Sequence, residues 1–415
     1  TTKSGVKIGF FGMETPETQT KANPTKIKGL TFATNDAFTK AAADQVEALK
    51  DADVVICLAH LGVDGESKPY RSTDLYAAVK GIDFIIDGHS HTVMTKGENG
   101  EPIQSTGTAF ANIGVIVIDD ATKKIESNSL FEIKEDTAKD ATVAAAAQKI
   151  IDRIDKEYGA VFAKSEVVLN GAKAPNGNRD SETNLGDLIT DAMLWKIRTQ
   201  ATISVPAENV VAITNGGGIR ADEKAGYWTF KTCKQVSPFG NVACLMSVTG
   251  KQIQDALEFA ARFAGEDGKE NGGFLQVAGA TYEIHTDIPN TVQTDEKNVW
   301  IGSATGTPRV QNVKIYDKAS GSYLPLDPGA TYALAGMNYT LRNLGDGFAM
   351  FDGAELIKDY VSEDYLVMST YAMTFGGVDA EGLPHLTTAN SPLADYPGYL
   401  LDYENPYGAG RISIL

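Results

Sequence analysis

The feature that most constrains this chain is an apolar run that ends in a glycine and two histidines, residues 84–91 (FIIDGHSH). His60 follows a similar run, so three of the five histidines stand at the ends of two neighbouring strand-like segments. In an open α/β sheet, ligands bind beyond the carboxyl ends of the strands, and neutral imidazole is a common metal ligand. We therefore expect His60, His89 and His91 to converge on a metal ion. The alternative is three loop histidines with ordinary hydrogen bonds.

Three imidazoles alone do not complete a site for phosphoryl chemistry with two ions. Two-metal sites normally add carboxylates that bridge the ions. Asp64 and Asp87 stand near the histidines, but neither matches a ligand position. The residues therefore indicate a metal site that needs further ligands.

The size and charge of the chain limit what it can do. At 415 residues it exceeds the usual size of a single core, so two domains are expected. The formal net charge of −17 argues against a nucleic-acid polymer as partner, because such affinity comes mainly from Lys and Arg on phosphates. A small phosphate-bearing substrate is compatible with it, since a metal or a few arginines reverse the local field. No run approaches the roughly 20 apolar residues of a transmembrane helix, and residues 1–11 do not resemble a signal peptide.

The three cysteines do not predict a disulfide scaffold. Cys57 lies inside a strand-like run and is expected to be a buried thiol. Cys233 and Cys244 could pair, but spacing does not fix the geometry of a disulfide. We favour free thiols at both positions.

The order of the predicted elements indicates the fold class. Strands over 54–59 and 84–86 alternate with helices, which implies a parallel sheet with right-handed crossovers. A long alanine-rich helical pattern then follows, and mixed strands and helices come after it. We therefore predict a mixed α/β protein with one domain over 1–139, a connector helix over 140–163 and a second domain over 164–415.

A glycine-rich loop, residues 215–220 (NGGGIR), follows the predicted strand 210–214. Three glycines let backbone N–H groups approach a ligand, and Arg220 offers a bidentate fork for phosphate or carboxylate. Arg179, in another polar loop, offers a second fork. The alternative is a flexible turn, because a glycine-rich turn alone is a weak signal.

Aromatic residues stand in two further polar loops. Phe239 lies in residues 238–241 (PFGN), and Tyr339 follows Asn338. Aromatic rings in such loops can clamp a planar base by stacking, and Asp346 could accept hydrogen bonds from sugar hydroxyls. For each loop taken singly, a turn with an aromatic lid on the core is the favoured alternative.

Together these segments resemble the 5′-nucleotidase family, which includes bacterial UDP-sugar hydrolases and animal ecto-5′-nucleotidases. The matching segments occur in the family's order and span nearly the whole chain. They are 59–62 (AHLG), 88–91 (GHSH), Arg179 with 182–187 (ETNLGD), 215–220, 238–241 and 345–348 (GDGF).

The resemblance implies an architecture and a role for each matching residue. The chain would hold the C-terminal half of a calcineurin-like metallophosphatase β-sandwich with flanking helices, then the connector helix, then a nucleotide-specificity domain. The implied roles are His60 and His89 as ligands of one metal ion, His91 as a ligand of the other, Arg179 and Arg220 on phosphate or carboxylate-like groups, Asn215, Gly218 and Asn241 on base or phosphate, Phe239 and Tyr339 around the base, and Asp346 on ribose hydroxyls.

The sequence also departs from the family's pattern. The family begins its metal domain with Asp-x-His, Gly-Asp and Gly-Asn-His-Glu segments, which supply the bridging carboxylate, other ligands and the catalytic histidine. None of them is found here. No catalytic residue is therefore assigned in this chain; those residues are expected upstream of Thr1, on a lost fragment or on a second chain. Tyr339 stands where phenylalanine is frequent, and the loop from it to Asp346 is one residue longer than usual.

The resemblance implies a secreted, cell-surface or periplasmic nucleotide phosphohydrolase. Two divalent ions, zinc, manganese or similar, would activate water for attack on a nucleoside 5′-phosphate, and this chain alone would be inactive without the missing ligands. Nucleotide sugars, dinucleotides and 2′,3′-cyclic nucleotides are alternative substrates. The competing hypothesis is a module that binds nucleotide or nucleoside without turning it over.

Overall fold

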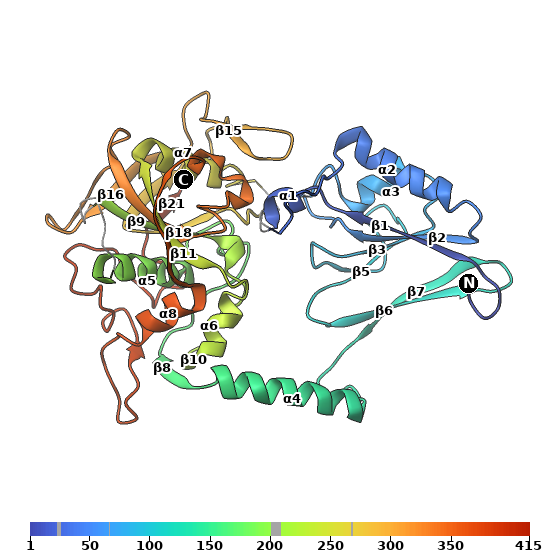
Figure 1. The fold of residues 1–415 in the computed structure, drawn as a ribbon, viewed down its shortest axis with the longest axis horizontal. Coiled ribbons are helices and arrows are strands. Elements are labelled where there is room, and N and C mark those ends of the chain that lie inside the picture. The colour runs from blue at the N-terminus through green and yellow to red at the C-terminus, as the bar shows by residue number, and fades with distance from the viewer. Residues whose placement is uncertain (23–25, 66, 201–208, 267–268) are drawn as a thin grey trace. The chain divides into compact units, whose positions relative to one another are not determined.

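The computed structural model describes residues 1–22, 26–65, 67–200, 209–266 and 269–415. The chain divides into two compact units. Figure 1 shows the chain coloured by residue number, from blue at the N-terminus to red at the C-terminus. The first unit is Thr1–Lys21 with Ile27–Val143, and the second is formed mainly by Ala144–Leu415. The division falls inside the stretch that the sequence predicts as a connector. The domain limits 1–139 and 164–415 stay predictions.

The first unit is built on a five-stranded sheet with the order β1-β2-β3-β5-β4. Its strands are β1 (Ile8–Glu14), β2 (Val54–His60), β3 (Phe84–Asp87), β5 (Ile103–Thr106) and β4 (Val93–Met94). The first four pair in parallel, and β4 pairs antiparallel with β5. β2 has neighbours on both sides and begins with four buried residues, as expected for a strand covered on both faces.

Different elements cover the two faces of this sheet. Helices α2 (Asn35–Ala48) and α3 (Ser72–Ala78) pack their apolar residues on one face, while α1 (Thr18–Lys21) is a single turn. The hairpin of β6 (Asn112–Asp119) and β7 (Lys124–Glu132) packs against the other face. The result is a helix layer, a sheet and a second β layer. Sequence analysis did not predict β7, because most of its residues are polar or charged and it has no long apolar run.

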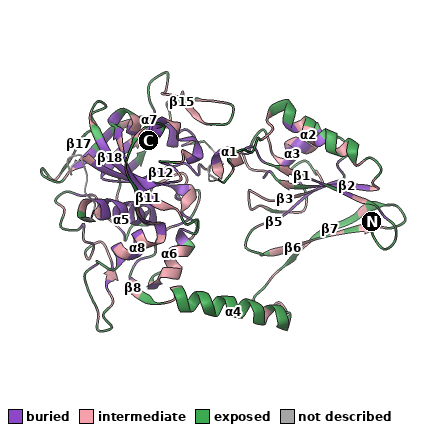
Figure 2. Cartoon of the chain, viewed as in Figure 1, coloured by how far each residue is buried: buried purple, intermediate pink, exposed green. Residues whose placement is uncertain are grey.

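The predicted connector is helix α4 (Ala141–Tyr158). None of its residues is buried, and Figure 2 shows it as an exposed helix. Its last turn is anchored in the second unit. There Lys234 Nζ lies 4.8 Å from the centre of the Tyr158 ring, and Tyr365 meets that ring edge-on.

The second unit is built on a mixed five-stranded sheet with the order β12-β9-β18-β11-β19. Its strands are β12 (Leu275–Ala278), β9 (Val210–Asn215), β18 (Thr331–Met337), β11 (Val242–Thr249) and β19 (Glu355–Glu363). β9 and β18 are parallel to one another, and the other neighbouring pairs are antiparallel. The carboxyl ends of β9 and β18 therefore lie at the same edge as the amino ends of β11 and β12.

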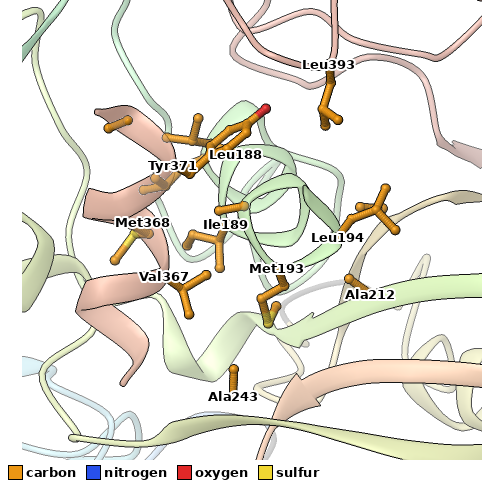
Figure 3. Close-up of a cluster of buried hydrophobic side chains, with 14 of the residues drawn as sticks. Leu188, Ile189, Met193, Leu194, Ala212, Ala243, Val367, Met368, Tyr371 and Leu393 are labelled. Carbon is orange, nitrogen blue, oxygen red and sulfur yellow. The ribbon is translucent and has the colours of Figure 1, made fainter. Parts of the chain in front are cut away.

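Alternation along the strands gives this sheet two cores. Ala212 of β9 faces the core with helices α5 (Asn184–Gln200) and α8 (Asp364–Ala372), whereas Val211 and Ile213 face the core with α7 (Gly250–Ala260). Successive side chains of a strand point to opposite faces, so one short apolar run supplies both cores. Figure 3 shows the first core, where Met193 and Leu188 of α5 lie beside Val367 and Tyr371 of α8.

Smaller elements complete the second unit. They are β8 (Val161–Ser165), β10 (Gly226–Thr229), α6 (Phe230–Val236), β13 (Ala280–Ile284), β14 (Gln293–Thr294), β15 (Trp300–Gly302), β16 (Val310–Asp317), β17 (Ser322–Pro325), β20 (His385–Leu386) and β21 (Ile412–Ile414), with short turns η2 (Gly216–Gly218), η3 (Gly345–Gly347) and η4 (Ala349–Phe351). The apolar run after β8 is not part of a strand: Leu169 makes only an isolated bridge with Glu223.

Two simpler predictions can be checked directly. Cys57, Cys233 and Cys244 are buried free thiols, and burial raises the pKa of Cys57 and of Cys244 to about 12. Within the described residues, no helix is both long and apolar enough to cross a membrane.

Candidate functional site

In the second unit, the residues predicted to contact nucleotide gather at one edge of the central sheet. Asn215 is the last residue of β9, and Tyr339 follows β18, whose carboxyl end lies at the same edge. Phe239 precedes β11, which begins there because it runs antiparallel to β18. The strand order thus brings together three segments that are far apart in sequence, residues 215–220, 238–241 and 339–346.

The glycine-rich loop is packed tightly against its neighbours. A Cβ atom on Gly216 would lie 1.9 Å from the carbonyl oxygen of Asn178, so only glycine fits there. Gly216 N donates to Phe274 O at 2.8 Å, and Gly217 N donates to Gly272 O at 2.7 Å. These two N–H groups hold the loop together, which differs from the expectation that the glycines free N–H groups for a ligand. The proposed ligand contact of Gly218 stays a prediction.

Asn215, Asp346 and Tyr339 form a hydrogen-bonded cluster. Asn215 Nδ2 donates to Asp346 Oδ2 at 2.8 Å, and the Tyr339 hydroxyl donates to Asp346 Oδ1 at 3.1 Å. Asp346 is 6% exposed and has a left-handed φ of 56°. Burial and the neighbouring Asp346 carboxylate raise the pKa of Tyr339 well above its usual range, so this tyrosine keeps its proton. The cluster therefore holds the carboxylate of Asp346 in one orientation.

The two predicted base-stacking rings differ in their surroundings. Phe239 is 58% exposed, and the Arg220 guanidinium carbon lies 5.5 Å from its ring centre. The ring of Tyr339 is half-buried and lies on Gly345, where a Cβ atom would come within 2.4 Å of it. Tyr339 is thus held by its hydroxyl and by one side of its ring, whereas Phe239 presents its ring to solvent. A base clamped between them stays a prediction.

The two predicted arginines lie in one charged group with Glu270. Arg179 Nη1 is 2.6 Å from Glu270 Oε1, and Asn271 N donates to Arg179 O at 3.0 Å. Partial burial of the Arg220 guanidinium lowers its pKa, the positive charge of Arg179 lowers it further, and Glu270 acts in the opposite direction. We call Arg179, Arg220 and Glu270 the anion cluster.

The loop that carries Phe239 and Asn241 is fixed by the start of helix α8. Asn241 N donates to Asp364 Oδ2 at 2.9 Å, and Asp364 N donates to Asn241 O at 3.0 Å. Asp364 is 3% exposed. Burial raises the pKa of Asp364 to about 6, and the backbone hydrogen bonds limit the rise. The backbone of Asn241 is therefore held in place, while the predicted ligand contact of its side chain stays untested.

A buried ionic network lies behind the Arg179 loop. Arg411 is fully buried, with Nη2 2.8 Å from Asp191 Oδ2 and Nη1 3.4 Å from Asp187 Oδ1. The hydroxyls of Tyr399 and Tyr403 also donate to Asp191, at 2.5 and 2.8 Å. Burial raises the pKa of Asp187, although Arg411 opposes the rise. These contacts join helix α5, which begins five residues after Arg179, to the last strand of the chain.

In the first unit, the structure brings His60 and His89 together. Their ring centres lie 5.1 Å apart, at the carboxyl ends of β2 and β3. A Cβ atom on Gly88 would lie 3.2 Å from His60 Nδ1, so this glycine leaves room for the ring. His89 Nε2 is 2.9 Å from Glu17 Oε2. Burial disfavours the charged imidazolium, but the contact with Glu17 outweighs it and raises the pKa of His89.

Asp87 ties the two histidine loops to one another. Its Oδ1 accepts hydrogen bonds from Leu61 N at 2.9 Å, Gly62 N at 3.3 Å and Gly88 N at 2.8 Å. The Ser72 hydroxyl donates to its Oδ2. The carboxylate therefore faces backbone N–H groups and positions the loops.

The metal prediction is met only in part by this geometry. Imidazoles at strand ends are suitable donors, but no three His, Cys, Asp or Glu side chains in the described part of the chain gather as a metal-binding group. His91 lies two residues beyond His89, half-buried and with φ 55°, and its role as a ligand stays a prediction. The described residues thus provide a pair of imidazoles rather than a full ligand set.

Sequence reasoning missed several residues that shape both regions. Glu17 contacts His89 across 72 positions, Glu270 contacts Arg179 across 91, and Asp364 contacts Asn241 across 123. No local motif therefore reveals these three acids. Asp87 left a usable signal, because an acid that ends a buried strand directly before Gly-His can accept hydrogen bonds from a neighbouring strand-end loop.

Comparison with known proteins begins with the second unit. Residues 161–353 match the family described as 5′-nucleotidase, C-terminal domain. The match begins at β8 and ends after η4, so it includes the glycine-rich loop, both arginines and Asp346.

Relatives extend the likeness over most of the chain. The trifunctional nucleotide phosphoesterase protein YfkN of Bacillus subtilis is 31% identical over 393 residues, which are 90% of this chain and 24% of that protein. A snake venom 5′-nucleotidase of Macrovipera lebetinus is 25% identical over 381 residues, or 84% of this chain and 85% of that protein. For the apyrase of Tabanus yao the chain spans 66% of the relative. The chain thus spans between about a quarter and two thirds of the length of several relatives.

Solved structures share the fold. The 5′-nucleotidase precursor of Thermus thermophilus superposes with a TM-score of 0.69 at 24% identity, over 99% of this chain and 73% of that one. The chain therefore shares the mixed α/β fold of that 5′-nucleotidase structure. It carries a 5′-nucleotidase C-terminal domain over residues 161–353 and resembles the 5′-nucleotidase family over most of its length.

Proposed function

We propose that this chain is the nucleotide-recognising part of a nucleotide phosphohydrolase that acts on nucleoside 5′-phosphates. The observation that carries the proposal is the cluster of Asn215, Asp346 and Tyr339 at the same sheet edge as Arg179 and Arg220. A nucleotide has a sugar, a base and an anionic group, and this edge presents an oriented carboxylate, an exposed aromatic ring and two guanidiniums. The relatives, which are nucleotidases and a nucleotide phosphoesterase by name, support it.

Each side chain has a proposed task in binding. Asp346, oriented by Asn215 and Tyr339, accepts hydrogen bonds from the ribose hydroxyls. Phe239 stacks on the base, because its ring is exposed and is positioned by a loop that Asp364 fixes. Arg179 and Arg220 bind the anionic group of the nucleotide. Asn215, Gly218 and Asn241 complete the proposed contacts to base or phosphate.

Hydrolysis is proposed to need ligands beyond the described residues. His60 and His89, and by proposal His91, would hold divalent ions such as zinc or manganese together with further ligands, because the described residues gather no group of three His, Cys, Asp or Glu side chains. Bound metal ions supply an activated water in phosphoryl transfer. In this chain the contribution of Asp87 and of the glycines beside the rings is to hold the imidazoles at two strand ends.

Two alternatives remain part of the proposal. In the first alternative, the isolated chain binds nucleotide without turnover. In the second, its substrates are nucleotide sugars, dinucleotides or 2′,3′-cyclic nucleotides. A secreted, cell-surface or periplasmic location is proposed, in view of the snake venom relative. No nucleic-acid polymer is proposed as a partner, in view of the net charge of −17.

Binding and turnover can be tested on the full chain. Calorimetry should detect binding of adenosine and of AMP without added metal. Phe239→Ala should weaken the binding of adenosine by about 1–2 kcal/mol, because a stacking ring is lost. Tyr407→Ala is the matched control, since Tyr407 is equally exposed, at 59%. Absence of adenosine binding would contradict the proposal. Phosphate release from AMP with Mn²⁺ or Zn²⁺, abolished by EDTA, would exclude the binding-only alternative.

A further inference from the structure

Glu270 has no task in the proposed function, although it lies in the anion cluster. It carries the same charge as the anionic group that the cluster is proposed to bind. Its carboxylate is 2.6 Å from Arg179 Nη1, and the two side chains are 26% and 11% exposed. An acid in this position weakens the attraction of the cluster for a second anion.

The cluster has a formal net charge of +1, from two arginines and one glutamate. The charges of Arg179 and of Glu270 both act on the pKa of Arg220, in opposite directions, so the three groups lie within electrostatic reach of one another. Without Glu270, a bound phosphate would meet two uncompensated guanidiniums.

The hydrogen bonds of the two guanidiniums differ. Arg179 uses Nη1 for Glu270, and its Nε is buried with no hydrogen-bond partner among the described residues. Arg220 Nη1 makes one long contact, 3.4 Å, to Gly217 O. Glu270 therefore restrains the more buried arginine, whereas Arg220 is exposed at the edge.

We propose that Glu270 is a specificity-determining residue, which lowers the advantage that the anion cluster gives to a doubly charged phosphate over a singly charged one. This inference rests on the proposed function. A terminal phosphate carries about −1.5 to −2 charges at pH 7, and a phosphodiester carries a single charge. A cluster of net charge +1 matches the diester of a 2′,3′-cyclic nucleotide or of a dinucleotide, and leaves a terminal phosphate partly uncompensated.

The test compares three ligands that share one base. Adenosine is neutral, 2′,3′-cyclic AMP carries one negative charge and AMP carries nearly two. Binding of each to the full chain is measured by calorimetry in EDTA, for the wild type, Glu270→Gln and Glu266→Gln. The control residue Glu266 lies on the same loop but pairs with Lys269 at 2.5 Å, with 41% of its side chain exposed. Both variants remove one negative charge, and circular dichroism checks that both fold.

The expected result is a change confined to charged ligands. Glu270→Gln should increase the affinity for AMP about tenfold relative to the affinity for adenosine, because the loss of the carboxylate leaves one more net positive charge near the ligand. The increase should be larger for AMP than for cyclic AMP. The gain should shrink at high salt. Glu266→Gln should leave all three affinities unchanged.

Two results would overturn the inference, and they are distinguishable. If adenosine binds but Glu270→Gln leaves the ratio of AMP to cyclic AMP unchanged, or weakens both, then Glu270 only holds Arg179 in place. If no variant binds adenosine, the proposed function fails and the inference fails with it.

Discussion

The histidine pair of the first unit and the hydrogen-bonded cluster of Asn215, Asp346 and Tyr339 in the second unit both lie at strand ends, but they differ in how their polar groups are partnered. His60 and His89 face one another across 5.1 Å, with Glu17 as the acid beside them. Asn215, Asp346 and Tyr339 satisfy one another directly. The comparison shows that bringing strand ends together is enough to gather side chains, whereas a working site also needs the full number of partners.

The second difference lies in what supports each region. Backbone N–H groups held by Asp87 position the histidine loops. The second unit adds buried charge, in Arg411 with Asp187 and Asp191, and a buried acid, Asp364. The predictions below test whether these supports make the cluster of Asn215, Asp346 and Tyr339 independent of the histidine pair.

The largest effect is expected at the buried network. Arg411→Met leaves Asp187 and Asp191 buried without their positive partner, which should destabilise the second unit by about 3–5 kcal/mol. Urea unfolding would measure it. Arg342→Met is the control, because Arg342 pairs with Asp359 near the surface, where an ion pair contributes about 1 kcal/mol or less. Equal losses in the two variants would refute the role of the network.

The next effect concerns pH and Asp364. Its pKa in the folded chain, about 6, exceeds the ordinary value of 3.8, so the native state binds the proton more tightly than the unfolded state. The contribution of Asp364 to the free energy of unfolding is therefore fully present below about pH 4. It is lost as the pH rises through 6, by up to about 3 kcal/mol. Asp364→Asn should flatten that part of the stability profile, measured by denaturant unfolding between pH 4 and 7. An unchanged slope would mean that the native carboxyl titrates normally.

A smaller effect is expected in nucleoside binding. Asp346→Ala removes the carboxylate that Asn215 and Tyr339 orient. It should weaken the binding of adenosine by about 1.5–3 kcal/mol, as for the loss of a hydrogen bond to a charged group. Asp352→Ala, at an exposed acid nearby in sequence, should have no effect. A comparable loss of 2′-deoxyadenosine and adenosine affinity in Asp346→Ala would argue against contact with the 2′-hydroxyl.

The smallest effect sharpens the comparison most. His60→Ala, or removal of metal by EDTA, should leave adenosine affinity unchanged within about 0.3–0.5 kcal/mol, as for energetically independent sites. Calorimetry on the same samples would show it. A clear loss of adenosine affinity in His60→Ala would mean that the two regions are coupled.

Several parts of this molecule could be predicted from sequence. The segments that form β2, β3 and β9 are largely continuous apolar runs, and such runs predict buried strands. The helix pattern of α4 and the cap at Thr249, whose hydroxyl accepts from Gln252 N at 3.2 Å, are local signals. The weak alternation of β7 and the short strands β10 and β20 gave no such signal.

The sequence by itself determined which residue types stand at the strand ends: the histidines, the glycine-rich loop, the two arginines and Asp346. Only the tertiary structure decided which of them meet. The parallel pairing of β9 with β18 brings Asn215 to Asp346 across 131 positions, and the loop before β12 places Glu270 on Arg179 across 91. Contacts of this kind depend on strand order and on burial, which local patterns do not encode.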